Sequence, residues 1–291
     1  MRFHLSSVLL SAAFLAGCAG TGDEASLAGS DIRFQAVIAE GAEPLEEPVS
    51  WVVTRLSEKS GAPGEVVATP TAAAPELSLA PGRYVVAARY GDAEAREEIV
   101  VGAEDASHVI DLNAGLVRLD MIPHAGAPVI TDDVTWEVYR YEKGRGVDER
   151  LRVVAATAPS RLFVLPAGYY TVRARHADSV ADMVVPVSAG HHFNYTLNLY
   201  AGKVSLSAVA ANGTVADDVT WRIVRATPNA NGERETVAQT VGGTPRLLLR
   251  EGRYIALARS GSLAGEAPFE IKAGNSQTVE VELNAVGKAD S

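Results

Sequence analysis

The sequence predicts an all-β fold made of three small β-sandwich domains in tandem. The first observation is a strand-like stretch built on Trp51, Trp136 and Trp221, the only tryptophans, each 85 residues from the next. The second is a Leu-x-x-Gly-x-Tyr stretch that recurs once per repeat. The third is the absence of helical periodicity longer than a turn or two beyond the N-terminal stretch. A fixed period of this length is typical of tandem copies of one domain, and each copy has room for about seven short strands.

The overall composition narrows the possible partners. The chain has 291 residues, of which 47% are hydrophobic, and 36 acidic residues against 26 basic ones give a formal charge of −10. This composition is that of a folded protein rather than a disordered one. Because the negative charge repels phosphate groups, we expect no nucleic-acid partner and no electrostatic docking on anionic lipid headgroups.

The N-terminus has the pattern of a secretory signal peptide, expected over residues 1–17. Its apolar stretch, Leu5 to Leu15, is too short to span a bilayer as a helix. Leu15-Ala16-Gly17-Cys18 follows, and Cys18 is the only cysteine. A lone cysteine at this place has no disulfide partner. The alternative is an ordinary secretory signal with a chance cysteine.

This stretch resembles the bacterial lipobox, in which the cysteine is acylated and becomes the first residue. The resemblance implies that acyl chains on Cys18 attach the protein to a membrane, and several chains make such an anchor stable. Residues 18–30 would form the acylated end and a flexible tether. Since Ala19 rather than Asp follows Cys18, the resemblance places the protein in the cell envelope at the outer membrane, on its periplasmic or surface face.

The domains are expected at residues 31–114, 115–201 and 202–291. In the second, Val134, Trp136 and Val138 alternate with polar or amphipathic residues, which predicts a half-buried strand with the indole inward. The repeated Leu-x-x-Gly-x-Tyr stretch predicts a glycine turn followed by a strand. The tyrosines of this stretch are expected in the core, each with its hydroxyl tying a turn; a ligand-stacking ladder is the alternative. They are Tyr84, Tyr170 and Tyr254.

Charged residues flank each tryptophan strand. An acidic residue precedes it and an arginine follows the tryptophan by four positions, which predicts ion pairs at the rim of each sandwich. A basic stripe for an acidic partner and a Ca²⁺ site between domains are the alternatives. The residues are Arg55, Arg140 and Arg225, with Glu47, Asp132 and Asp217.

The order of these motifs resembles the CnaB and carboxypeptidase-regulatory-like families, whose small sandwiches are transthyretin-like or immunoglobulin-like. The resemblance covers residues 31–286 and implies spacers, adhesive stalks and binding modules. CnaB domains of surface pilins often carry a Lys–Asn isopeptide bond, for which the third repeat offers Lys203 and Asn284.

We found no metal motif, nucleophile elbow or phosphate-binding loop, so we expect no enzyme, metal or cofactor. The leading hypothesis is a non-enzymatic, lipid-anchored array for structure, adhesion or protein display, with an envelope protein or glycan as partner. The alternative is an array of carbohydrate-binding modules, and a third possibility is a hydrolase or inhibitor with its residues in loops. The candidate sugar-stacking rings are Tyr90, Tyr139, Phe193, Tyr195 and Tyr200.

Overall fold

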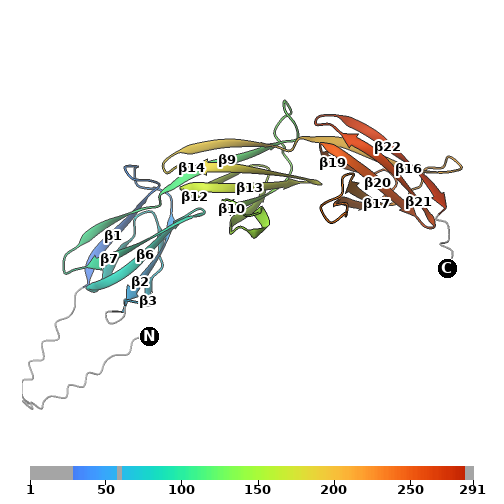
Figure 1. Ribbon diagram of the computed structural model, residues 1–291. Coiled ribbons are helices and arrows are strands. Elements are labelled where there is room, and N and C mark those ends of the chain that lie inside the picture. Colours follow the sequence, from blue (N-terminus) through green and yellow to red (C-terminus); the bar gives the residue numbers. More distant parts are fainter. Residues whose placement is uncertain (1–28, 58–60, 286–291) are drawn as a thin grey trace, which may run out of the picture.

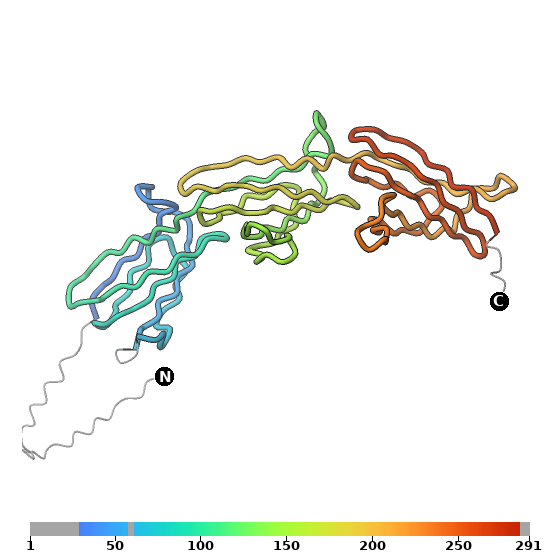
Figure 2. Tube along the Cα trace, in the orientation of Figure 1, coloured from blue at the N-terminus to red at the C-terminus, as the bar shows by residue number. Residues whose placement is uncertain are grey.

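The computed structural model describes residues 29–57 and 61–285. They fold into three β-rich units, here called units one, two and three, which follow one another along an arc (Figures 1 and 2). The predicted all-β fold of tandem β-sandwiches is confirmed. The predicted signal peptide and Cys18 lie outside the described residues. Within those residues no helix is long and apolar enough to cross a membrane.

Unit one consists of β1 (Ser30–Val37), β2 (Val49–Leu56), β3 (Pro63–Ala68), β4 (Thr71–Ala72), β5 (Glu76–Leu79), β6 (Gly82–Tyr90), β7 (Ala93–Val101) and β8 (Ala106–Asp111). Its first sheet has the order β5-β1-β8, in which β8 runs parallel to β1. The second has the order β3-β2-β6-β7, and β4 also pairs with β2. We call this second sheet, and its counterparts, the tryptophan sheet.

Unit two repeats this topology with β9 (Ala114–Ile122), β10 (Val134–Arg140), β11 (Arg152–Ala158), β12 (Arg161–Pro166), β13 (Gly168–His176), β14 (Ser179–Val187) and β15 (His192–Asn198). The sheets are β12-β9-β15 and the tryptophan sheet β11-β10-β13-β14. A short 3-10 helix, η1 (Val147–Glu149), lies in the connection between β10 and β11.

Unit three consists of β16 (Ala201–Ala210), β17 (Thr220–Arg225), β18 (Thr236–Val241), β19 (Arg246–Arg250), β20 (Gly252–Ser260), β21 (Leu263–Ile271) and β22 (Ser276–Ala285). The tryptophan sheet is β18-β17-β20-β21. The end of β22 also pairs with the start of β21, so both sheets join into one of seven strands.

Each unit has its own buried apolar cluster, because residues alternate between a buried and an exposed face along the strands. Trp51, Trp136 and Trp221 sit at the centres of these clusters and are at most 1% exposed. Each indole N–H donates to a backbone carbonyl of its own unit, at 2.8–2.9 Å. The buried polar atom is therefore satisfied, and the ring fills the core without an unpaired donor.

Candidate functional site

The recurring tyrosines are buried, and each ties the turn before it. The hydroxyls of Tyr84, Tyr170 and Tyr254 donate to the carbonyl oxygen four residues upstream, at 2.7, 2.7 and 2.5 Å. The glycine between, such as Gly252 with φ +149°, adopts a backbone conformation that side chains resist. Burial raises the pKa of Tyr254, an effect that Arg225 and Arg250 oppose.

The structure does not pair the recurring arginines with the predicted carboxylates, and the ion pair of Arg225 is with Glu235 instead, at 3.9 Å. Strand pairing places Arg55 opposite Tyr84, Arg140 opposite Tyr170 and Arg225 opposite Tyr254. The three guanidinium groups lie over the tyrosine rings, with the guanidinium carbon 5.9, 5.8 and 5.0 Å from the ring centre. The expected acidic partners precede the opposite end of the same strand, roughly 25 Å away at 3.3 Å per residue. They are Glu47, Asp132 and Asp217.

The suggested isopeptide pair is also wrong. Lys203 pairs with Ser276 at one end of the parallel strands β16 and β22. Asn284 follows Leu283, which is the partner of Ala210 at the other end. The two side chains are therefore separated by most of the strand length, and an amide bond between them would need a different register.

The two junctions between units are built in the same way. Only two residues separate β8 from β9, and two separate β15 from β16. The second of each pair, Asn113 or Tyr200, has a positive φ of 46° or 53°. Its N–H donates to the side chain two residues earlier, Asp111 at 2.7 Å or Asn198 at 2.8 Å. This local bond stabilises a backbone conformation that non-glycine residues rarely adopt.

Backbone bonds then fix the direction of the next strand. The carbonyl of Asn113 accepts from Ala167 and that of Tyr200 from Glu251, both at 2.7 Å. The next residue, Ala114 or Ala201, makes backbone hydrogen bonds to both units. Its N–H donates to the preceding unit, and its carbonyl accepts from the following unit. The distances are 2.8 and 2.8 Å at Ala114, and 2.8 and 2.9 Å at Ala201. With so many bonds over so few residues, each junction behaves as a rigid corner rather than a linker.

A hairpin tip of the preceding unit makes further contacts at each junction. The β6–β7 tip carries Asp92 and the β13–β14 tip carries Asp178, whose carboxylates accept backbone hydrogen bonds from Val164 and Leu248 of the next unit. Burial raises the pKa of both carboxyl groups, and these backbone bonds oppose the rise. Ser179 also donates its hydroxyl to the carbonyl of Leu248 at 2.8 Å.

The equivalent positions at the two outer ends of the row differ. Unit three has Ser262 where the other tips have an aspartate, and unit one has Ser78 where units two and three have Val164 and Leu248. Ser78 instead donates its hydroxyl to the carboxylate of Asp31 within unit one. Among the described residues, a tip aspartate and an apolar residue facing it in the next unit therefore occur together only at the two internal junctions.

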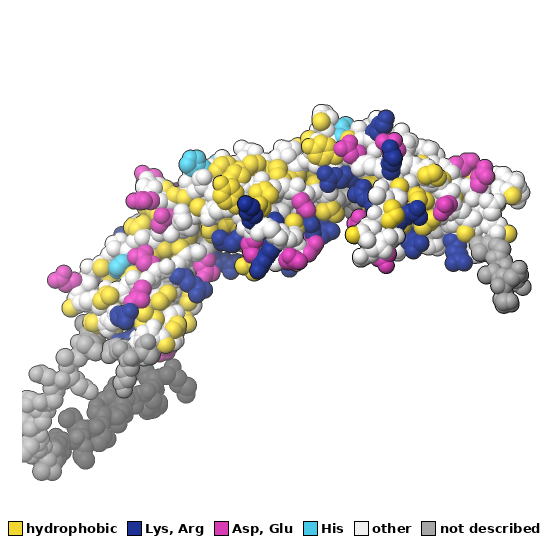
Figure 3. Space-filling model, in the orientation of Figure 1, with side chains coloured by type: hydrophobic (Ala, Val, Ile, Leu, Met, Phe, Trp, Pro, Cys, Tyr) yellow, Lys and Arg dark blue, Asp and Glu magenta, His cyan; other side chains and the backbone are white. Residues whose placement is uncertain are grey.

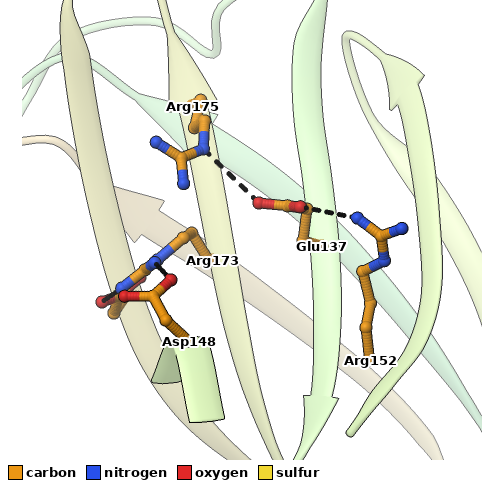
Figure 4. Close-up of polar contacts among 6 residues, drawn as sticks. Glu137, Asp148, Arg152, Arg173 and Arg175 are labelled. Carbon is orange, nitrogen blue, oxygen red and sulfur yellow. Dashed lines mark hydrogen bonds and ion pairs between the residues drawn. The ribbon is translucent and has the colours of Figure 1, made fainter. Parts of the chain in front are cut away.

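Unit two carries a charged network on the solvent face of its tryptophan sheet (Figure 4). Glu137 accepts from Arg152 at 3.1 Å and from Arg175 at 3.4 Å. Burial alone would raise the pKa of Glu137, but hydrogen bonds from Arg152, Tyr139 and Arg175 outweigh it and lower the pKa. This carboxylate therefore stays ionised between its two guanidinium partners.

The second part of the network holds the insert that contains η1 against the sheet. Arg173 donates to Asp182 at 2.8 and 2.9 Å and to Asp148 of η1 at 2.6 Å. Arg150 of the insert donates to Thr171 of β13 and lies over the ring of Tyr141. The charged loop is thus folded onto its own unit through side chains with compensating charges.

The candidate sugar-stacking rings do not form an exposed platform. Phe193 and Tyr195 stack on each other at 5.8 Å and pack against the core of unit two. Tyr139 is buried and Tyr90 packs against the core of unit one. Tyr200 is exposed but belongs to a junction. Among the described residues no three acidic, histidine or cysteine side chains group together as metal ligands.

The chain is similar to one known protein family over part of its length. A family described as a Rhizobiales growth-associated tandem repeat domain matches residues 203–283, which fall in unit three. No curated protein sequence matches the chain.

Three solved structures are similar to this chain at low sequence identity. The Bacillus anthracis TIE protein is 15% identical over 88% of this chain with a TM-score of 0.27, and the chain spans 51% of that protein's length. The minor pilin of Streptococcus agalactiae is 14% identical, with 61% of this chain and 98% of the pilin covered and a TM-score of 0.35. A streptococcal ancillary pilin is 13% identical, with 88% and 99% covered and a TM-score of 0.33.

Proposed function

We propose that this chain is a non-enzymatic, lipid-anchored protein of the cell envelope whose three sandwich units act as a rigid spacer that displays binding surfaces. The observation that carries the proposal is the junction that is built twice with the same bonds, at Asn113–Ala114 and at Tyr200–Ala201. A chain that needed only three binding domains would tolerate flexible linkers. A repeated rigid corner fixes both reach and orientation.

The spacer role is tested by small-angle X-ray scattering of the purified chain. With strands of nine or ten residues, each unit is roughly 35 Å long and the row roughly 100 Å. A rod of that length has a radius of gyration of roughly 30 Å, whereas a compact chain of this size has about 19 Å. A value near the lower figure, or a broad distribution of distances, would contradict a rigid row.

The anchor is proposed at Cys18, with outer-membrane attachment through its acyl chains. Growth with radiolabelled palmitate should label the wild-type protein, which should partition into the detergent phase of Triton X-114. Cys18→Ser should remove both the label and the partition. The proposed anchor is refuted if the wild-type protein stays in the aqueous phase.

A further inference from the structure

The solvent face of the tryptophan sheet in unit three is hollowed. The hollow has a volume of about 780 Å³ and is formed by β17, β18, β20 and β21. Leu257, Ala264 and the exposed Val241 supply apolar surface, and Arg222 and Arg259 supply guanidinium groups. This volume is in the range of ligand-binding clefts. Basic side chains also gather along the lower, concave side of the row in Figure 3.

The register identifies the same place in unit two. Across the sheet of unit three, Arg222 pairs with Leu257 and Leu257 with Glu266. In unit two the corresponding row is Glu137, Arg173 and Asp182. There the side chains neutralise one another and occupy the face, whereas Leu257 in place of the central arginine leaves the hollow open.

The two faces also differ in their electrostatics. Arg259 of unit three corresponds to Arg175 of unit two, which is paired with Glu137. In unit three the position of that glutamate is taken by Arg222, a second cation. In the described part of the chain, no hydrogen bond or ion pair joins the guanidinium group of Arg222 or Arg259 to another residue. The face therefore keeps the guanidinium group of Arg259 and has that of Arg222 where unit two has a carboxylate.

One carboxylate remains in the hollow. Glu266 lies on β21 opposite Leu257, so the three charged side chains of the face sum to +1. An occupant that fits must place a carboxylate near Arg222 and Arg259 and an apolar group over Leu257 and Val241. Among the described residues that line the hollow, the only aromatic one is Trp221, whose ring is fully buried, so no ring is offered for stacking on a sugar.

We propose that this hollow binds an acidic peptide segment with interleaved apolar side chains, presented by a partner protein. A carboxylate of that segment pairs with Arg222 and Arg259, as Glu137 pairs with two arginines on the face of unit two. In unit two a carboxylate, that of Glu137, satisfies Arg175, the arginine that corresponds to Arg259. The inference rests on the proposed display function and names the chemistry of its partner.

The test is fluorescence anisotropy with the purified full chain and a labelled Glu-Leu-Glu-Leu-Glu peptide. The peptide should bind, more weakly at high salt, and the matched Lys-Leu-Lys-Leu-Lys peptide should not. Arg222→Glu restores the unit-two arrangement beside Arg259 and should weaken binding at least tenfold. Arg246→Glu, on the other sheet of unit three, should bind like wild type.

Circular dichroism melting checks that both variants fold. The inference is overturned if the acidic peptide does not bind, if Arg222→Glu binds it as tightly as wild type, or if polygalacturonate competes for the hollow more strongly than the peptide does. Each of these results would leave the scattering and detergent-partition tests of the spacer untouched, so the two proposals fail separately.

Discussion

Replacing Trp221 by alanine should strongly destabilise unit three while leaving the stability of unit one unchanged. The indole is fully buried in the third apolar cluster, and its N–H donates to the carbonyl of Gly242. Truncating a buried tryptophan costs about 3–5 kcal/mol. A unit of this size has a total stability of roughly 4–12 kcal/mol, so the loss is a large share.

Hydrogen–deuterium exchange resolves the effect unit by unit. A loss of 3–5 kcal/mol corresponds to a roughly 10²- to 10⁴-fold loss of protection for the slowest amides of unit three. Unit two should lose a smaller part of its protection, because it contacts unit three through Ser179 and Leu248. Unit one shares no core residue with unit three and should exchange as in wild type.

Trp221→Phe is the matched control. It keeps most of the buried ring and removes the hydrogen bond to Gly242, so it should cost only about 1–2 kcal/mol. If the alanine variant reduces protection equally in all three units, the cores do not fold as separate nearest-neighbour elements, and the reasoning is refuted.

Three further predictions concern the turns and junctions. Gly202→Val should bend or loosen the second junction, because its Cβ would lie 2.5 Å from a carbonyl oxygen of the β21–β22 turn; small-angle scattering should then give a wider range of maximum dimensions. Tyr170→Phe removes the hydroxyl bond to Pro166 and should lower the free energy of unfolding by about 1 kcal/mol in urea titrations. Asp178→Asn should flatten part of the pH dependence of stability measured by the same titrations. Since burial raises the pKa of Asp178 in the folded chain, its stabilising contribution is fully present below the ordinary aspartate pKa. This contribution is lost as pH rises through the pKa that Asp178 has in the folded chain. If Asp178→Asn leaves the pH dependence of stability unchanged, Asp178 does not make this contribution.

The sequence predicted the fold because the largest core residue recurs at a constant interval. Trp51 and its two counterparts mark one strand per unit, and alternation around them shows which face is buried. It did not predict the partners of Arg55 and its counterparts. Spacing along one strand says which face a side chain occupies, but the residue opposite it depends on register with a distant strand. That register brings Arg55 to Tyr84 rather than to Glu47.

The sequence did not predict the contacts of the junction aspartates, for a different reason. Asp92 and Asp178 occur in only two of the three repeats, so a comparison of repeats gives no consistent signal at this position. Their role depends on a neighbour in the next unit, Val164 or Leu248, which lies about 70 residues further along the chain. The attachment of the inserted turn at Asp148 to Arg173 also depends on a tertiary contact.

The distribution of docking residues means that the units cannot be exchanged freely. Only unit two has both a residue that meets the tip of the preceding unit, Val164, and a tip aspartate that meets the following unit, Asp178. A longer row of units would therefore be made by copying unit two. Every added copy would then contact its neighbours through the same tip aspartate and the same facing residue. Copying unit one or unit three would set a serine, Ser78 or Ser262, at the joint in place of the residues found there in unit two.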